Sequence, residues 1–284
     1  MKFAVFTVST PDYEPLPLME VLSKLEYDGV EWRTIEDKGD RSKPSFWSGN
    51  RASLSCADLL ARANELKRKA EALNLEMPSL AAYIDTSNLA VVEDHCRAAA
   101  AVGAKNLRIG PGAYKPDNGP FRTQFAAARA RYAEVAKIAA RHHVRAVVET
   151  HMGLLTPSAC LARSLLEGLD PKHVGIMWDP GNQVVEGGEV YAMAISIAGE
   201  YLAEVHAKNT SHMLKEVKNG HQIWATTSVP LREGVVDWPD VISELRRAGY
   251  DGWIVFEDFS TTYPLLERLQ GNLAWFRELA NAEL

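Results

Sequence analysis

Eight short apolar or β-branched runs recur along the 284 residues, and each is followed by a segment whose apolar residues repeat at helical spacing. Strands that alternate with helices favour a parallel sheet joined by right-handed crossovers. Eight such units predict that residues 1–284 form a single (β/α)8 TIM barrel of the α/β class rather than an open sheet. The expected strands are Phe3–Thr7, Gly29–Trp32, Glu76–Leu80, Asn106–Ile109, Ala146–Glu149, Gly175–Asp179, Leu202–His206 and Ile254–Glu257.

Two long polar segments interrupt this alternation. Residues 34–54 contain Pro44 and Trp47 and follow the second expected strand, whereas residues 209–236 follow the seventh. Each lies between a strand and its helix, on the face where barrel enzymes place their substrate-binding loops. Both segments are therefore predicted to be long loops at the mouth of the barrel.

A weak internal repeat supports the repeated units. The stretch LSKLEYDGVEW near residue 23 resembles ISELRRAGYDGWIVFE near residue 242. In each copy a helix is expected to end at an Asp-Gly pair that leads directly into a strand. Gly29 and Gly252 are expected to supply the permissive backbone that follows a helix C-terminus.

Composition narrows the classes of function. A formal net charge of −6 argues against a protein that grips nucleic acid over its whole surface. Cys56, Cys96 and Cys160 form no disulfide framework, and the N-terminal apolar run is too short for a secretory signal. No apolar stretch approaches the roughly 18 residues that a transmembrane helix needs. We therefore expect a cytoplasmic protein without nucleic-acid or membrane partners.

Four of the expected strands end in a side chain that can bind a metal ion: Glu149, Asp179, His206 and Glu257. The first three are spaced by about one strand–helix unit, and the last interval is longer by the second loop. All four would stand at the mouth of neighbouring strands. Three carboxylates and one imidazole predict a single divalent ion (Mn²⁺, Mg²⁺, Co²⁺ or Zn²⁺), with Mn²⁺ favoured. Taken singly, an acid here can instead cap the next helix, and a histidine can be a hydrogen-bonded core residue.

The segments VVETH, WDPGN, VHAKN and GYDGWIVFED make the chain resemble the sugar isomerase/epimerase family with a xylose-isomerase-like barrel. The resemblance extends over nearly the whole chain. It implies that Glu149, Asp179, His206 and Glu257 bind one divalent ion, and that Glu149 and Glu257 also transfer protons. Ketose 3-epimerases of that family typically carry a histidine at the position of Asn182, and an arginine where this chain offers Lys208 or His212. In these features the chain is more similar to the inosose-dehydratase branch.

Six further residues are candidate substrate contacts. His151 follows Glu149 by two positions, so both side chains face the same way; it could act as a base or only support its neighbours. Lys208 could bind a substrate oxygen or pair with an acid such as Glu257. Arg108 could bind an anion or neutralise the acidic mouth. The set is His151, Lys208, Arg108, Asn182, Trp47 and His212.

The leading hypothesis for function is an aldose–ketose isomerase or ketose epimerase that acts on a small sugar or polyol-derived substrate through an enediolate, with the two glutamates moving the proton. A dehydratase, which shares the first proton abstraction but expels a hydroxyl group, is the alternative. An apurinic-site endonuclease is less favoured because the third and fourth expected strands end without histidine. A sugar-binding protein without activity, and a homo-oligomer, stay open.

Overall fold

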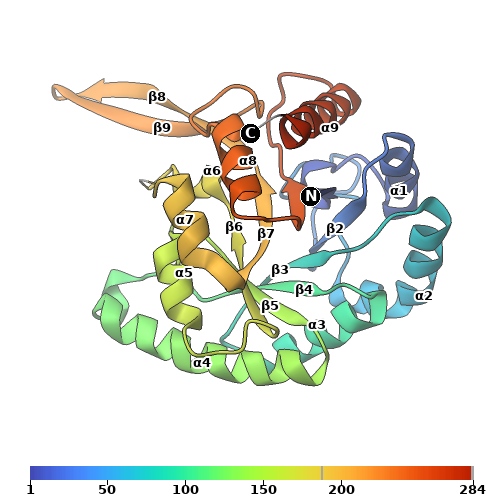
Figure 1. Cartoon of the computed structure of the whole chain (residues 1–284), viewed down its shortest axis with the longest axis horizontal. Coiled ribbons are helices and arrows are strands. Elements are labelled where there is room, and N and C mark those ends of the chain that lie inside the picture. The colour runs from blue at the N-terminus through green and yellow to red at the C-terminus, as the bar shows by residue number, and fades with distance from the viewer. Residues whose placement is uncertain (187, 283–284) are drawn as a thin grey trace.

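The computed structural model describes residues 1–186 and 188–282. Eight parallel strands of this part of the chain form a closed barrel with the helices outside it (Figure 1). The order around the barrel is β1, β10, β7, β6, β5, β4, β3, β2, and the seam closes where Phe3 pairs with Ile254. The barrel strands are β1 Lys2–Phe6, β2 Gly29–Thr34, β3 Ser79–Asp85, β4 Asn106–Gly110, β5 Arg145–Glu149, β6 Val174–Trp178, β7 Leu202–Ala207 and β10 Trp253–Phe256.

This topology confirms the predicted (β/α)8 barrel. The bounds of β3 were wrong, since we expected Glu76–Leu80 and the strand occupies Ser79–Asp85. Pro78 has no backbone N–H to donate to a ladder, so continuous pairing begins after it. Glu76 makes only an isolated bridge to Gly29. The strand instead uses the following SLAAYID run, whose first four residues are buried.

The helices form because their ends are capped and one face is apolar. In α2, Ser55 and Asp58 form a reciprocal capping box, and Leu59, Ala63, Leu66 and Ala70 turn one buried face toward the strands. Asp237 caps α8 by accepting from the backbone N–H of Asp240. The helices are α1 Pro15–Lys24, α2 Cys56–Leu73, α3 Leu89–Val102, α4 Phe121–Arg141, α5 Ala159–Leu166, α6 Pro180–Gln183, α7 Tyr191–Ala198, α8 Trp238–Arg247 and α9 Leu265–Asn281.

The reason given for Gly29 and Gly252 was wrong. Neither is among the residues with positive φ; the left-handed positions after these helices are Glu26 (φ 66°) and Gly249 (φ 71°). The two positions require glycine because neighbouring atoms leave no room for a Cβ. A Cβ at Gly29 would lie 2.7 Å from the carbonyl oxygen of Glu76, and one at Gly252 would lie 2.6 Å from the Tyr250 ring.

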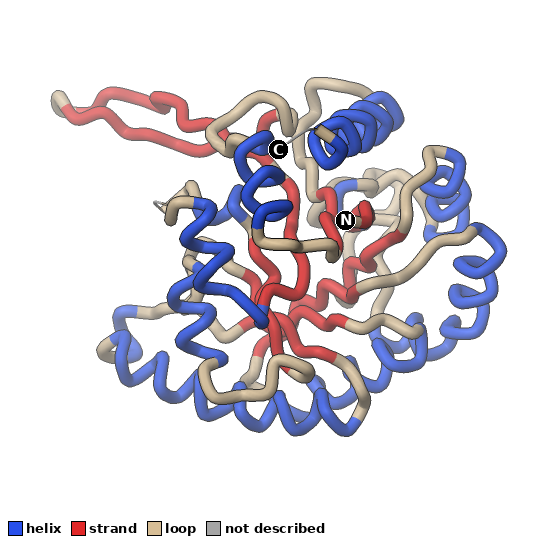
Figure 2. The backbone as a smooth tube through the Cα atoms, viewed as in Figure 1, coloured by secondary structure: helices blue, strands red, loops and turns tan. Residues whose placement is uncertain are grey.

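Most of residues 209–236 form an antiparallel hairpin where we expected a loop. Strand β8 (Asn209–Lys218) pairs with β9 (His221–Val229), and this ribbon projects away from the barrel (Figure 2). The turn residues Asn219 and Gly220 both have positive φ (51° and 79°), the type I′ geometry that Asn-Gly prefers in hairpins. We call residues 209–229 the ribbon.

Residues 34–54 lack such regular structure but are fixed by one buried carboxylate. Asp37 accepts hydrogen bonds from the backbone N–H groups of Gly39, Gly49 and Asn50. Its Oδ2 also forms an ion pair with Arg33 Nη1 at 3.0 Å. Although burial opposes ionisation, these donors hold the pKa of Asp37 below its ordinary value. The segment is therefore anchored to β2 at its base.

The large apolar core packs around the outside of the strands and includes Trp32, Trp178 and Trp238, all fully buried. Inside the barrel the apolar cluster is small: Ala4, Phe6, Val8, Ala81 and Val255. Much of the remaining interior is polar. Among the helices described, none has the combination of length and apolar composition that a bilayer crossing requires.

Candidate metal centre and pocket

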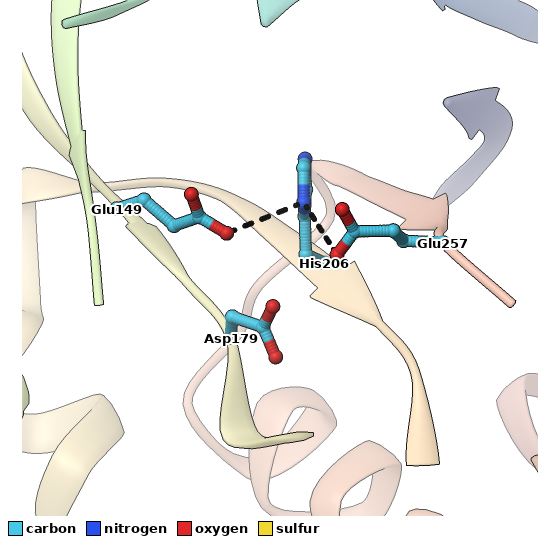
Figure 3. Close-up of side chains that lie close together, drawn as sticks. All are labelled: Glu149, Asp179, His206 and Glu257. Carbon is cyan, nitrogen blue, oxygen red and sulfur yellow. Dashed lines mark ion pairs between the residues drawn. The ribbon is translucent and has the colours of Figure 1, made fainter. Parts of the chain in front are cut away.

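The structure brings the four predicted donors together. One ligand atom each of Glu149, Asp179, His206 and Glu257 lies within 4.8 Å of the others. Figure 3 shows Glu149 and Glu257 approaching His206 from opposite sides, with Asp179 beside them. All four are buried, at 4% exposure or less. We call this set the donor layer.

Asp179 is positioned by the turn between β6 and α6. Its Oδ1 accepts from the backbone N–H of Asn182 at 2.8 Å and so caps α6, while its Oδ2 accepts from the Asn182 side-chain amide and pairs with Lys208. Capping and site formation are thus two uses of one carboxylate. Burial raises the pKa of Asp179 to about 6, although Lys208 acts in the opposite direction.

Glu149 ends β5 between a cation and an amide. Its Oε2 accepts from Arg108 Nη1 at 2.8 Å, and its Oε1 accepts from Asn182 Nδ2 at 3.0 Å. Burial opposes ionisation, but the Arg108 guanidinium holds the pKa of Glu149 below its ordinary value. Arg108 therefore keeps this carboxylate charged and fixes its orientation.

Lys208 joins two members of the donor layer. Its Nζ lies 2.9 Å from Asp179 Oδ2 and 2.9 Å from Glu257 Oε2. Burial disfavours the ammonium, yet these acids hold the pKa of Lys208 above its ordinary value. Burial likewise opposes the charge on Glu257, whose pKa Lys208 and His206 hold well below its ordinary range. A Cβ at Gly181 would lie 2.5 Å from Lys208 Cγ, so glycine makes room for this side chain.

His206 presents different nitrogens to two groups of residues. Its Nδ1 lies 3.7 Å from Glu257 Oε2 and 3.9 Å from Glu149 Oε1, whereas its Nε2 lies 3.0 Å from Glu31 Oε1. Burial lowers the pKa of His206, but Glu31 and Glu257 outweigh it and hold the pKa well above its ordinary value. A proton on Nε2, shared with Glu31, would leave Nδ1 as the ligand atom toward the carboxylates.

A second polar set lies one layer deeper in the barrel: Glu31, Ser79, Asn106 and Glu204, called the lower layer. Ser79 Oγ donates to Glu31 Oε2, and Asn106 Nδ2 donates to Glu204 Oε2 at 3.0 Å. Glu204 precedes His206 by two positions, so strand alternation turns both inward. Burial, with the Glu31 charge nearby, raises the pKa of Glu204 to about 8.

The donor set fits a divalent ion. Three carboxylates face two fixed cations, Arg108 and Lys208, so the layer is one positive charge short when His206 is neutral, as a metal ligand must be. Among the described residues, both ring nitrogens of His206 are buried without a hydrogen bond of good geometry. Oxygen donors with one imidazole suit Mn²⁺, Mg²⁺, Co²⁺ or Zn²⁺. The cluster can therefore hold a metal ion.

The donor layer opens into a cavity of about 600 Å³. Five of the six predicted substrate contacts line it: His151, Lys208, Arg108, Asn182 and Trp47. His151 Nδ1 lies 2.7 Å from the carbonyl oxygen of Met152, and Trp47 packs 4.9 Å from the Phe259 ring. His212 is different, because it is exposed on the ribbon and is not one of the lining residues. Its strand carries it past the cavity.

Several cavity residues were not predicted. Tyr83 stacks 4.7 Å from the Arg108 guanidinium, Phe259 faces Trp47, and Thr226, Thr227 and Ser228 of β9 form part of the wall. The lower-layer acids were also missed. The available signal was the acid within each apolar strand run, GVEW and AEVH, because a carboxylate there must find a partner inside the barrel.

Comparison with known protein families identifies the family of this chain. A model of the xylose isomerase-like TIM barrel family matches residues 19–279. The chain belongs to this family. The match confirms the resemblance that the strand-end motifs carry.

Among curated proteins, the rhizopine catabolism protein MocC of Rhizobium meliloti is 26% identical over 145 residues, covering 48% of this chain and 41% of that protein. The inosose dehydratase of Bacillus velezensis is 27% identical over 128 residues, covering 43% and 42%. The aligned stretches therefore span less than half the length of these relatives.

Solved structures agree on the fold. D-psicose 3-epimerase of Clostridium cellulolyticum superposes with a TM-score of 0.71 at 16% identity, covering 99% of this chain and 100% of that one. The IOLI protein with bound zinc superposes with a TM-score of 0.74 at 14% identity, covering 99% and 98%. The proteins similar to this chain thus include an epimerase with a similar fold and an inosose dehydratase with a similar sequence.

Proposed function

We propose that this chain is a metal-dependent sugar isomerase or epimerase that moves a proton beside the carbonyl of a small sugar-like substrate. The observation that carries the proposal is the placement of Glu149 and Glu257 on opposite sides of one buried donor layer (Figure 3). One divalent ion, with Mn²⁺ favoured, would be held by Glu149, Asp179, His206 and Glu257. When bound, it would polarise the substrate oxygens and acidify the adjacent C–H bond. The IOLI protein, a similar barrel, carries zinc.

The two glutamates would divide the proton transfer. One carboxylate removes the proton from the carbon next to the carbonyl, and the other, once it has taken up a proton from solvent, donates that proton to the flat enediolate from the opposite face. Return to the same carbon inverts it, whereas return to the neighbouring carbon isomerises the sugar. Arg108 and Lys208 hold the acids ionised, as bases must be. The D-psicose 3-epimerase with a similar fold supports this chemistry.

A dehydratase is the second candidate, favoured by Lys208. Its ammonium touches Glu257 and also lines the cavity, so it can assist departure of a β-hydroxyl group once Glu257 or Glu149 has taken the proton. His151, another lining residue, can serve the same purpose. The similarity to an inosose dehydratase supports this alternative.

One screen separates the two reactions. The protein with added Mn²⁺ is incubated in deuterated water with ketoses, inosose and hydroxy-keto acids, and products are followed by mass spectrometry and NMR. An isomerase or epimerase yields a product of unchanged composition with deuterium on carbon. A dehydratase yields a product that has lost water. Absence of both deuterium exchange and product with every substrate would contradict the proposal.

Substrate preference is proposed to reside in residues 34–54 and 209–236. Trp47 from the first segment and Thr226 to Ser228 from the second line the cavity above the donor layer. Trp47→Ala and Thr227→Val should change relative kcat/KM among substrates without altering metal stoichiometry. His212→Ala is the matched control, since its side chain is exposed outside the lining. Metal loss with unchanged preference would assign the segments a structural role.

A further inference from the structure

The ribbon is the region of the described chain least covered by the rest of the fold. Within residues 1–186 and 188–282, β8 and β9 pair only with each other, and both outer edges stay open. Yet the ribbon carries large apolar side chains: Val217 is 59% exposed, Trp224 57%, Met213 51% and Leu214 45%. A two-stranded hairpin standing alone in water is marginally stable. Such a cluster of exposed apolar groups marks an interaction surface.

These side chains are arranged as contact surfaces on both faces. Leu214 pairs across the strands with Trp224, and Met213 pairs with Ala225 on the other face. The ribbon projects beyond the helices (Figure 2), so its far half is out of reach of its own barrel. A second molecule is needed to cover it.

We propose that the ribbon is a dimerisation arm that packs against a second copy of this chain. Charge supports this partner. Lys215, Lys218 and Glu216 give the ribbon a formal net charge of +1. Since the whole chain carries a formal net charge of −6, the residues outside the ribbon carry −7. This projecting element is therefore basic on an acidic molecule, and the body of another copy attracts it.

The available area also suffices for a twofold dimer. About nine residues per strand at about 3.4 Å each give a ribbon about 30 Å long, and two strands give a face about 10 Å wide. One face thus covers about 300 Å². In a twofold assembly each copy contributes an arm and receives one, so the total buried surface is about 1,200 Å², the lower bound of stable interfaces.

The arm also lies next to the cavity. Thr226, Thr227 and Ser228 at its base form part of the cavity wall, whereas Trp224 stands further along the same strand. A second copy held by the arm would therefore sit beside the mouth of the barrel. The proposal does not depend on the reaction, because assembly is measured without substrate.

Sedimentation velocity and light scattering at about 1 to 100 μM test the proposal. The unmodified chain should sediment as a dimer. Leu214→Glu combined with Trp224→Glu should raise the dimer dissociation constant by about 100-fold or more, because the arm would bury carboxylates in an apolar contact. The matched control is Met193→Glu with Leu266→Glu, at side chains 47% and 48% exposed on α7 and α9. The control should remain dimeric.

A second variant tests the charge argument while keeping the apolar side chains. Lys215→Glu with Lys218→Glu should weaken the dimer by about tenfold at low salt, and the difference should shrink as salt screens it. If the unmodified chain is monomeric at 100 μM, the proposal is wrong, even if the arm binds a different protein. A Leu214/Trp224 variant that stays fully dimeric would overturn it as well.

Discussion

The two polar layers inside the barrel are built from similar residues but have different surroundings. The donor layer has three carboxylates, two cations and an opening to the cavity. The lower layer has two carboxylates, Glu31 and Glu204, with a hydroxyl and an amide for neutral partners. His206 touches both. The difference indicates that cations keep Glu149 and Glu257 charged at the mouth, whereas Glu204 beneath them, which has only neutral donors, takes up a proton.

The largest effect is expected at the residue shared by the two layers. His206→Ala removes the one nitrogen donor of the donor layer and leaves Glu31 Oε1 buried without its partner, so bound Mn²⁺ should fall from one per chain to nearly none. Metal analysis after dialysis measures this. His151→Ala is the control and should retain full stoichiometry. Retention of one ion by His206→Ala would remove His206 from the centre.

Next come the two carboxylates assigned to proton transfer. Glu149→Gln and Glu257→Gln each keep the side-chain shape and a neutral oxygen ligand but lose the base, so kcat should fall by about 100-fold or more. Metal affinity should fall less than in His206→Ala. Solvent deuterium exchange into substrate reports the step directly. If both variants exchange at the parental rate with metal bound, neither is the base and His151 becomes the candidate.

A smaller effect is expected when the lower layer is changed beneath an intact donor layer. Glu31→Gln weakens the acceptor for His206 Nε2, so the Mn²⁺ dissociation constant should rise by about 10- to 100-fold. At saturating Mn²⁺, kcat should change by only a few fold. Titration calorimetry measures the Mn²⁺ dissociation constant, and kinetics at saturating Mn²⁺ measure kcat. An equal loss of kcat at saturating metal would place Glu31 in the reaction instead.

The smallest effect is expected at Glu204, and it depends on pH. Since its pKa is raised to about 8, the folded protein keeps a proton on it that the unfolded chain loses above about pH 4.3. Its stabilising contribution is full at low pH and is lost between about pH 4.3 and 8, by up to about 1.4 kcal/mol per pH unit.

Urea unfolding of the metal-free protein at pH 5, 6.5, 8 and 9 measures this contribution. Glu204→Gln mimics the protonated acid, so it should flatten the decline between pH 5 and 8 while leaving Mn²⁺ affinity at pH 7 almost unchanged. Identical pH profiles for the variant and the parent would show that Glu204 is ionised in the folded state.

The fold and the donor layer could be predicted because one geometric rule covers both. Parallel strands of a barrel end at one mouth, so Glu149, Asp179, His206 and Glu257 had to converge once their strands were recognised. Arg108 and Asn182 followed from the same rule. The alternative role of an acid after a strand, capping the next helix, also applied, since Asp179 caps α6. Sequence spacing does not exclude one role when another is present.

The rest depended on contacts that spacing does not encode. Glu31 and Glu204 come from strands that are not neighbours in the barrel, so only the closed structure shows that both lie beneath His206. The ribbon was missed for a different reason. Its Asn219-Gly220 turn is a strong hairpin signal, but the polar residues around it favoured a loop. His212 was placed at the site because the segment was expected to be a loop at the mouth of the barrel.

Strand β10 gives the barrel a seam. It is four residues long, closes the sheet against β1, and is followed at once by Glu257. Any native-state fluctuation that frays β10 from its neighbours therefore also withdraws one of the four donors. An ion bound across β7 and β10 would resist that opening by mass action, and more strongly as its concentration exceeds its dissociation constant. In a cell, the metal concentration would then set how often β10 frays from its neighbours and hence how fast a protease cleaves the chain.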